Sequence, residues 1–130
     1  MDKLEKKIDS FLKARGWDGL RPSDLAKSIM IEGAELLELF QWENLPLEEV
    51  KSDKAKIEEI KKELADVFIY AIQMSVLLGL NTEKIILAKL RRVEKKYPAA
   101  LLRQKAKRES GSGQDSEYWK IKRRHRKNKK

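Results

Sequence analysis

Two pairs of acidic residues stand within apolar, helix-periodic sequence and restrict what this 130-residue chain can fold into. Each pair has the i,i+3 spacing that puts both carboxylates on one helix face: Glu32 with Glu35, and Glu63 with Asp66. An ionised carboxylate on a core-facing surface is costly unless it is paired or coordinates a cation. No Lys or Arg stands three or four residues from either acid of the first pair. The pattern therefore favours two helices that hold four carboxylates around a divalent metal over four solvated surface acids.

Helical periodicity extends over almost the whole chain, and strand-like alternation appears nowhere in the sequence. Capping residues and helix breakers indicate where each helix begins and ends. The sequence therefore predicts an all-α bundle of four to five helices. We expect helices at 3–14, from Ser23 or Asp24 as N-cap to about Trp42, from about Asp53 to Leu78 with Gly79 as its stop, and from Asn81 or Thr82 to before Pro98, with a short acidic turn after Pro46.

The helix expected to end at Leu78 is apolar nearly all the way round in its second half. A helix without a polar face must be enclosed by other elements. The remaining helices of so short a chain offer too little cover, so a second copy of the chain is the natural partner. We therefore expect the bundle to be completed by homo-oligomerisation, as a homodimer or a homotetramer.

The net charge of +9 comes entirely from the C-terminal end. Residues 1–98 contain 18 Lys+Arg and 18 Asp+Glu, whereas residues 99–130 contain 12 basic and 3 acidic residues. We expect an all-α domain at 1–108 and a flexible basic tail at 109–130. Such a tail can bind nucleic acid through phosphate charge. The alternative function is therefore a non-catalytic helical nucleotide- or RNA-binding module, which the core-facing carboxylates disfavour. Alternatively, a small apolar cluster at 118–121 could let the tail form a short helix that docks on the body.

Composition also bears on the compartment. The chain has no Cys, which excludes disulfides and thiolate chemistry and fits a reducing cytoplasm. The first residues are charged throughout, so we expect no signal peptide. The longest apolar run, Val67 to Leu80, is interrupted by Gln73 and is too short for a membrane span. We expect a cytoplasmic protein with no membrane contact.

The carboxylate spacing also suits a four-helix di-iron site, but such sites add a Glu-x-x-His motif. The single histidine, His125, lies in the basic tail. Magnesium prefers oxygen ligands and binds through a few carboxylates together with substrate phosphates. The sequence therefore favours Mg²⁺, with Mn²⁺ as a substitute, and a phosphate-bearing substrate.

Three segments, 25–42, 61–80 and 89–98, resemble the MazG-like all-α nucleoside triphosphate pyrophosphohydrolases, most closely the small dCTP-pyrophosphatase-like branch. The resemblance covers about 15–98 and implies Mg²⁺-dependent hydrolysis of an NTP or dNTP to the monophosphate and pyrophosphate. Pyrimidine dNTPs such as dCTP, or modified nucleotides, are the implied substrates, and nucleotide-pool house-cleaning is the implied role. The implied metal ligands are the four paired acids, Glu32, Glu35, Glu63 and Asp66.

The resemblance also implies substrate contacts. Trp17 and Trp42 match aromatic residues at the nucleobase, although packing of the N-terminal helix and a helix-end contact explain them equally well. Tyr70 lies one turn after Asp66 and is expected at the sugar or base. Lys89 matches a lysine that neutralises phosphate charge, although a lone helical lysine is usually solvent-exposed.

The chain departs from the family pattern at two positions. Arg21 is the nearest residue to a histidine that many relatives carry, and Val93 stands where an asparagine is common. Both changes affect base or phosphate contacts, so the reaction class is better defined than the substrate.

Either Glu35 or Glu38 is expected to position the attacking water, although Glu38 also fits a solvated surface acid.

Overall fold

The computed structural model describes the backbone of residues 2–106 and 117–128, and the side chains of residues 2–103 and 120–128. These residues form helices without any strand, which confirms the predicted all-α class. The chain divides into two compact units, Met1–Thr82 and Glu83–Lys130. The helices are α1 (Lys3–Ala14), α2 (Pro22–Glu38), α3 (Leu47–Ser52), α4 (Lys54–Leu77), α5 (Thr82–Lys96), α6 (Ala99–Ala106) and α7 (Glu117–Lys127).

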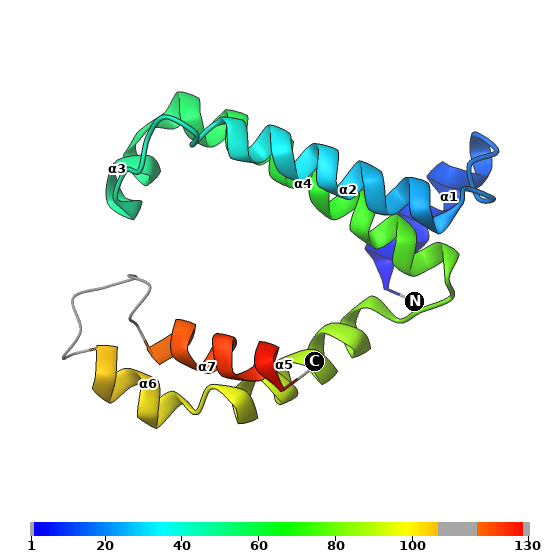
Figure 1. The fold of residues 1–130 in the computed structure, drawn as a ribbon. Coiled ribbons are helices and arrows are strands. Elements are labelled where there is room, and N and C mark those ends of the chain that lie inside the picture. The colour runs from blue at the N-terminus through cyan, green and yellow to red at the C-terminus, as the bar shows by residue number, and fades with distance from the viewer. Residues whose placement is uncertain (1, 107–116, 129–130) are drawn as a thin grey trace. The chain divides into compact units, whose positions relative to one another are not determined.

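The first unit is built on the long pair α2 and α4, which run side by side in opposite directions (Figure 1). Helix α1 packs against α4. The small core of this unit consists of Ile8 and Leu12 from α1 and Leu25 from α2, each less than a tenth exposed. Because α2 and α4 are antiparallel neighbours, the acid pair on one helix can face the acid pair on the other.

Helix α2 begins and ends earlier than predicted. Its N-cap is Arg21 and not Ser23 or Asp24, because Pro22, whose fixed φ suits the first helical position, starts the helix. It ends at Glu38, and the following turn tightens, with the Phe40 N–H bonded to the Leu37 carbonyl at 2.9 Å. The predicted extension to Trp42 is therefore wrong, and Trp42 lies in the turn that follows the helix.

The turn after α2 is tied to α4 by Lys56. Its ammonium group lies 2.7 Å from a Glu43 carboxylate oxygen and 5.2 Å from the centroid of the Phe40 ring. The lysine side chain is only 13% exposed, whereas the glutamate side chain is 51% exposed. This contact fixes the far end of the α2–α4 pair.

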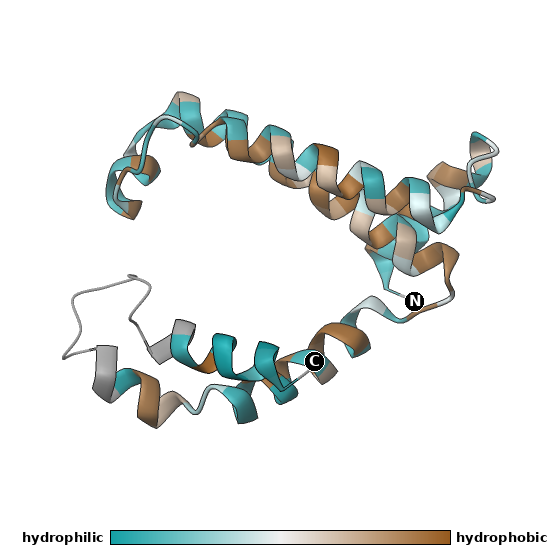
Figure 2. Cartoon of the chain, viewed as in Figure 1, coloured by the Kyte–Doolittle hydropathy of each residue, from teal (hydrophilic) through white to brown (hydrophobic). Residues whose placement is uncertain are grey.

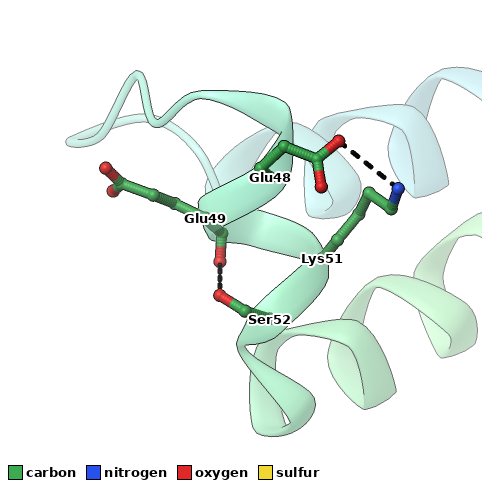
Figure 3. Close-up of polar contacts among 4 residues, drawn as sticks. All are labelled: Glu48, Glu49, Lys51 and Ser52. Carbon is green, nitrogen blue, oxygen red and sulfur yellow. Dashed lines mark hydrogen bonds and ion pairs between the residues drawn. The ribbon is translucent and has the colours of Figure 1, made fainter.

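The segment predicted as an acidic turn forms the short helix α3. Figure 3 shows its two local contacts: the Lys51 ammonium lies 3.4 Å from a Glu48 carboxylate oxygen, and the Ser52 hydroxyl donates to the Glu49 carbonyl at 2.9 Å. All four residues are exposed, so these contacts add little stability to the fold. Helix α3 serves as the connection into α4.

Helix α4 has the ends that the sequence predicted. The Asp53 side chain accepts a hydrogen bond from the Lys56 N–H at 3.1 Å, which caps the N-terminus. At the other end Gly79 adopts a φ of 68°, a conformation that glycine takes without steric cost. The Leu80 N–H then bonds back to the Ser75 carbonyl at 2.9 Å and closes the helix end.

Thr82, the first residue of α5 and the last residue of the first unit, is hydrogen-bonded to α1 and α4. A carboxylate oxygen of Glu5, on α1, accepts a hydrogen bond from the Thr82 N–H at 3.0 Å. The Thr82 hydroxyl donates to the Ser75 hydroxyl at 2.8 Å. Glu5 and Ser75 are each 4% exposed, so both are buried polar residues with partners.

In the second unit α6 and α7 lie side by side. Residues 117–127, predicted as part of a flexible tail with a short docked helix as the alternative, form helix α7, of which Ile121 is 5% exposed. Figure 2 shows that α7 is predominantly hydrophilic. The predicted boundary between 108 and 109 lies outside the described residues, as do the side chains of Tyr118 and Trp119, so the predicted domain division stays a prediction.

Large apolar residues on α4 are exposed in the single chain. Leu64, Phe68 and Ile69 are each at least a third exposed, with Phe68 at 56%. The predicted homo-oligomer would cover this exposed apolar surface, and the oligomeric state stays a prediction. Among the described helices none is by itself long and apolar enough to cross a membrane. Only α4 and α5 counted together reach that length and apolarity, and this pair is bent.

Candidate functional site

Three carboxylates from α2 and α4 converge in the first unit. Glu32, Glu63 and Asp66 each present one oxygen, and these three oxygens lie within 4.8 Å of one another. The i,i+3 spacing puts Glu63 and Asp66 on one face of α4, and the antiparallel neighbour α2 brings Glu32 opposite to them. The side chains are neither fully buried nor freely exposed. We call these three residues the carboxylate trio.

Two oxygens of the trio lack partners. The Oε2 atoms of Glu32 and Glu63 are buried and have no hydrogen-bond partner among the described residues. Buried polar atoms in native proteins are nearly always satisfied by a donor, a water molecule or an ion. Two such acceptors on opposite helices, beside a third carboxylate, have the chemistry that a hard divalent cation requires. The donor set therefore fits Mg²⁺.

The electrostatics of the trio point the same way. Hydrogen bonding with Glu35, followed by burial and by repulsion from the other acids, raises the pKa of the Glu32 carboxyl. Burial, followed by hydrogen bonding with Glu35 and by repulsion from its acidic neighbours, raises the pKa of the Glu63 carboxyl. Repulsion between the charged forms contributes to both shifts, and a cation between the carboxylates would relieve that repulsion.

The other two predicted acids lie at the edge of the trio. Glu35 is exposed and is not one of the three converging residues, yet its carboxyl interacts with both Glu32 and Glu63. Glu38 is also exposed and adds to the repulsion felt by Glu63. Both are therefore near the proposed cation position, on the solvent side of the trio.

A cavity of about 430 Å³ opens beside Asp66, which is within the size range of small-molecule sites. It holds two of the predicted substrate residues, Trp17 and Tyr70. The ring of Phe11 meets that of Trp17 edge-on, with centroids 6.0 Å apart. The lining residues are Phe11, Trp17, Leu20, Asp24, Leu25, Ser28, Asp66, Ile69, Tyr70 and Gln73.

The remaining predicted substrate residues do not line this cavity. Arg21 is exposed at the N-cap of α2. Trp42 is 88% exposed in the turn after α2, roughly 25 Å along that helix from its N-terminal end. Lys89 lies on α5 in the second unit, where it lines a separate basic cavity of about 840 Å³. The structure thus brings Trp17 and Tyr70 together with Asp66, but not Arg21 or Trp42.

Gln73, a polar residue of the cavity wall, was not predicted from the sequence as a site residue. Gln73 is 4% exposed, and its Oε1 atom has no hydrogen-bond partner in the described part of the chain. Its spacing was a usable signal, because Asp66, Tyr70 and Gln73 follow one another at helical intervals on a single face of α4. The sequence had marked Gln73 only as the polar interruption of an apolar run.

Comparison with known proteins identifies a family and a solved structure to which the chain is similar. A sequence profile of the MazG-like family matches residues 27–111, which include all of the predicted carboxylates. The crystal structure of a pyrophosphatase from Archaeoglobus fulgidus superposes with a TM-score of 0.65 and 36% sequence identity, and the match covers 74% of this chain and 90% of that one. No curated protein sequence matches the chain.

Proposed function

Because this chain belongs to the MazG-like family and is a nucleotide pyrophosphohydrolase, we propose that it hydrolyses an NTP or dNTP to the monophosphate and pyrophosphate with Mg²⁺. The observation that carries the proposal is the carboxylate trio, Glu32, Glu63 and Asp66, with its two unpartnered buried oxygens. Mn²⁺ is the expected substitute because carboxylate ligands suit it as well.

Each carboxylate has a proposed role. Glu32, Glu63 and Asp66 hold the cation, and Glu35 completes the set from the solvent side. Bound Mg²⁺ supplies positive charge that neutralises the polyphosphate and favours attack by water. Glu35 is exposed and interacts with two of the ligands, so it is the proposed acceptor of the proton from the attacking water. Glu38 is the alternative acceptor.

The cavity beside Asp66 is the proposed nucleoside site. Trp17 offers an aromatic face for the base, and Tyr70 combines an aromatic ring with a hydroxyl that can reach the sugar or base. We propose that Arg21 provides positive charge to the phosphates, and the contact of Lys89 with a phosphate stays a prediction from the family resemblance. Trp42 is 88% exposed in the turn after α2, and its contact with a base stays a prediction.

The proposed substrates are pyrimidine dNTPs such as dCTP, or modified nucleotides, and the proposed role is house-cleaning of the cytoplasmic nucleotide pool. We also propose that the working form is a homodimer or homotetramer, because Leu64 and Phe68 on α4 are exposed in the single chain. Light scattering coupled to gel filtration measures this directly. A monomer at micromolar concentration would contradict the oligomer.

The reaction is tested by product analysis. The purified chain is incubated with a panel of NTPs and dNTPs, with Mg²⁺ and with EDTA, and the products are separated by ion-exchange chromatography. We expect monophosphate and pyrophosphate in equal amounts with Mg²⁺ and none with EDTA. Asp66→Asn should abolish turnover without loss of helix content, whereas Glu59→Gln, an exposed acid on the same helix, should retain it. Release of orthophosphate, or no turnover of any nucleotide by the folded chain, would overturn the proposal.

A further inference from the structure

Gln73 is a buried amide without a partner, on the wall of the cavity beside Asp66. Its side chain is 4% exposed and lies on α4, between the apolar residues Ile72 and Met74. The Oε1 atom has no hydrogen-bond donor among the residues that the structure describes. A buried acceptor in that condition costs free energy, and leucine of nearly the same size would avoid the cost. A ligand that donates a hydrogen bond inside the cavity would supply what Oε1 lacks.

The other two polar residues of the first unit that are less than a tenth exposed, Ser75 and Glu5, do not share this condition. Ser75, two residues further along α4 and equally buried, accepts a hydrogen bond from the Thr82 hydroxyl at 2.8 Å. Glu5, also 4% exposed, accepts from the Thr82 N–H at 3.0 Å. Gln73 is therefore distinguished from its buried neighbours by the missing partner and by its position on the cavity wall.

The surroundings of Gln73 indicate the kind of ligand. The wall that it shares carries the aromatic rings of Phe11, Trp17 and Tyr70, which suit a flat ring. Flat heterocycles with N–H or amino groups at their edge are read in this way, by stacking between aromatic side chains and by hydrogen bonds to the edge. Asp66 lines the same cavity and belongs to the carboxylate trio, so one ligand can reach Gln73 and the proposed cation together.

We propose that the Gln73 amide hydrogen-bonds the polar edge of the nucleobase and thereby determines which base the enzyme accepts. This inference rests on the proposed hydrolysis of nucleotides at the same site. The Oε1 atom accepts from a ring N–H or an exocyclic amino group of the base. The amide NH₂ of the same side chain can donate to an adjacent ring nitrogen or carbonyl, and such two-point contacts between a glutamine and a base are selective.

The test compares each base with an analogue that has no hydrogen-bond donor on its Watson–Crick edge. For the base that the wild-type enzyme prefers, kcat/KM is compared with that of the analogue: 2-pyrimidinone for cytosine, purine for adenine, 1-methylhypoxanthine for guanine, or the 3-methyl base for uracil and thymine. We expect the wild type to prefer the intact base by at least about tenfold, the loss that follows from leaving a buried polar group unpaired. Gln73→Leu should reduce this preference to within about twofold.

Two further measurements separate base recognition from a structural role. The unfolding midpoint of the Mg²⁺-free protein should be unchanged or higher in Gln73→Leu, because the variant removes an unpaired buried acceptor. Ser75→Ala is the matched control: it removes a paired buried hydroxyl from the same helix and should lower the midpoint while the base preference stays at the wild-type value.

An active, folded Gln73→Leu enzyme that keeps the wild-type preference would overturn the assignment of Gln73. A wild-type preference below tenfold would do the same. Failure of the proposed function has a different signature, because the wild-type protein would then turn over no nucleotide at all. The two failures are therefore distinguishable in one set of assays.

Discussion

Replacing Glu63 by Gln should stabilise the Mg²⁺-free protein and remove most of its stabilisation by Mg²⁺. Glu63 has a raised pKa, caused first by burial and then by its interactions with Glu35 and the other nearby acids. At a pH below about 4.5, its ordinary value, the carboxyl is protonated in both the folded and unfolded chain. As the pH rises the unfolded chain ionises first, so folded-state stability falls until folded Glu63 ionises as well. A glutamine does not ionise and avoids this loss.

The stabilisation by Mg²⁺ depends on its concentration relative to its dissociation constant. A ligand at 100 times its dissociation constant stabilises the folded state by about 2.7 kcal/mol. The site lies wholly within Met1–Thr82, and a domain of that size gains roughly 4–8 °C in its unfolding midpoint per kcal/mol. The wild type should therefore gain about 10–20 °C. If the variant binds Mg²⁺ about a hundredfold more weakly, the same concentration stabilises it by only about 0.4 kcal/mol, or roughly 2–3 °C.

Thermal unfolding followed by circular dichroism, at pH 7.5 with EDTA and with Mg²⁺, measures both effects. The matched control is Glu58→Gln, on the same helix. Glu58 is exposed, and a hydrogen bond from Lys61 at 2.8 Å lowers its pKa, so it contributes stability above its unfolded pKa that is lost as the pH falls. Glu58→Gln should retain the full gain from Mg²⁺. A Glu63→Gln variant that gains as many degrees from Mg²⁺ as the wild type would refute the assignment of Glu63 as a ligand.

Mg²⁺ affinity, measured by calorimetry, should fall as the pH is lowered through the raised pKa values of Glu32 and Glu63, because protons compete with the cation; an affinity independent of pH would contradict this. In urea unfolding, Glu5→Leu should lose about 1–3 kcal/mol because the Thr82 N–H is left without its acceptor, and Glu5→Gln, which keeps an acceptor, should lose less. Leu12→Ala removes a side chain that is 0% exposed and should cost about 2–5 kcal/mol by the same measurement; a loss below 1 kcal/mol would mean that the α1–α4 contact is not a true core.

Interactions between residues close in sequence were readable without the fold. The start of α4 follows from Asp53, whose side chain accepts a hydrogen bond from the backbone N–H three residues further along the chain. The end of α4 follows from Gly79. The pairing of Glu63 with Asp66 on one face follows from helical geometry alone. These features depend on contacts that span at most a few residues, so the local sequence determines them. The same reasoning misplaced the end of α2, because the turn at Trp42 is tied down by Lys56 from another helix.

Contacts between distant parts of the chain were determined by the tertiary structure. The sequence supplied four candidate ligands, but only the packing of α2 against α4 brings three of them within 4.8 Å and leaves Glu35 at the edge. Nothing in the local sequence distinguishes Glu5 from a surface acid, yet it is buried and hydrogen-bonded to a residue 77 positions away. Gln73 is polar in any sequence, and its lack of a partner exists only once α1 and α2 surround it. Helical spacing determines which residues share a face, whereas burial and the presence of a partner depend on what that face meets.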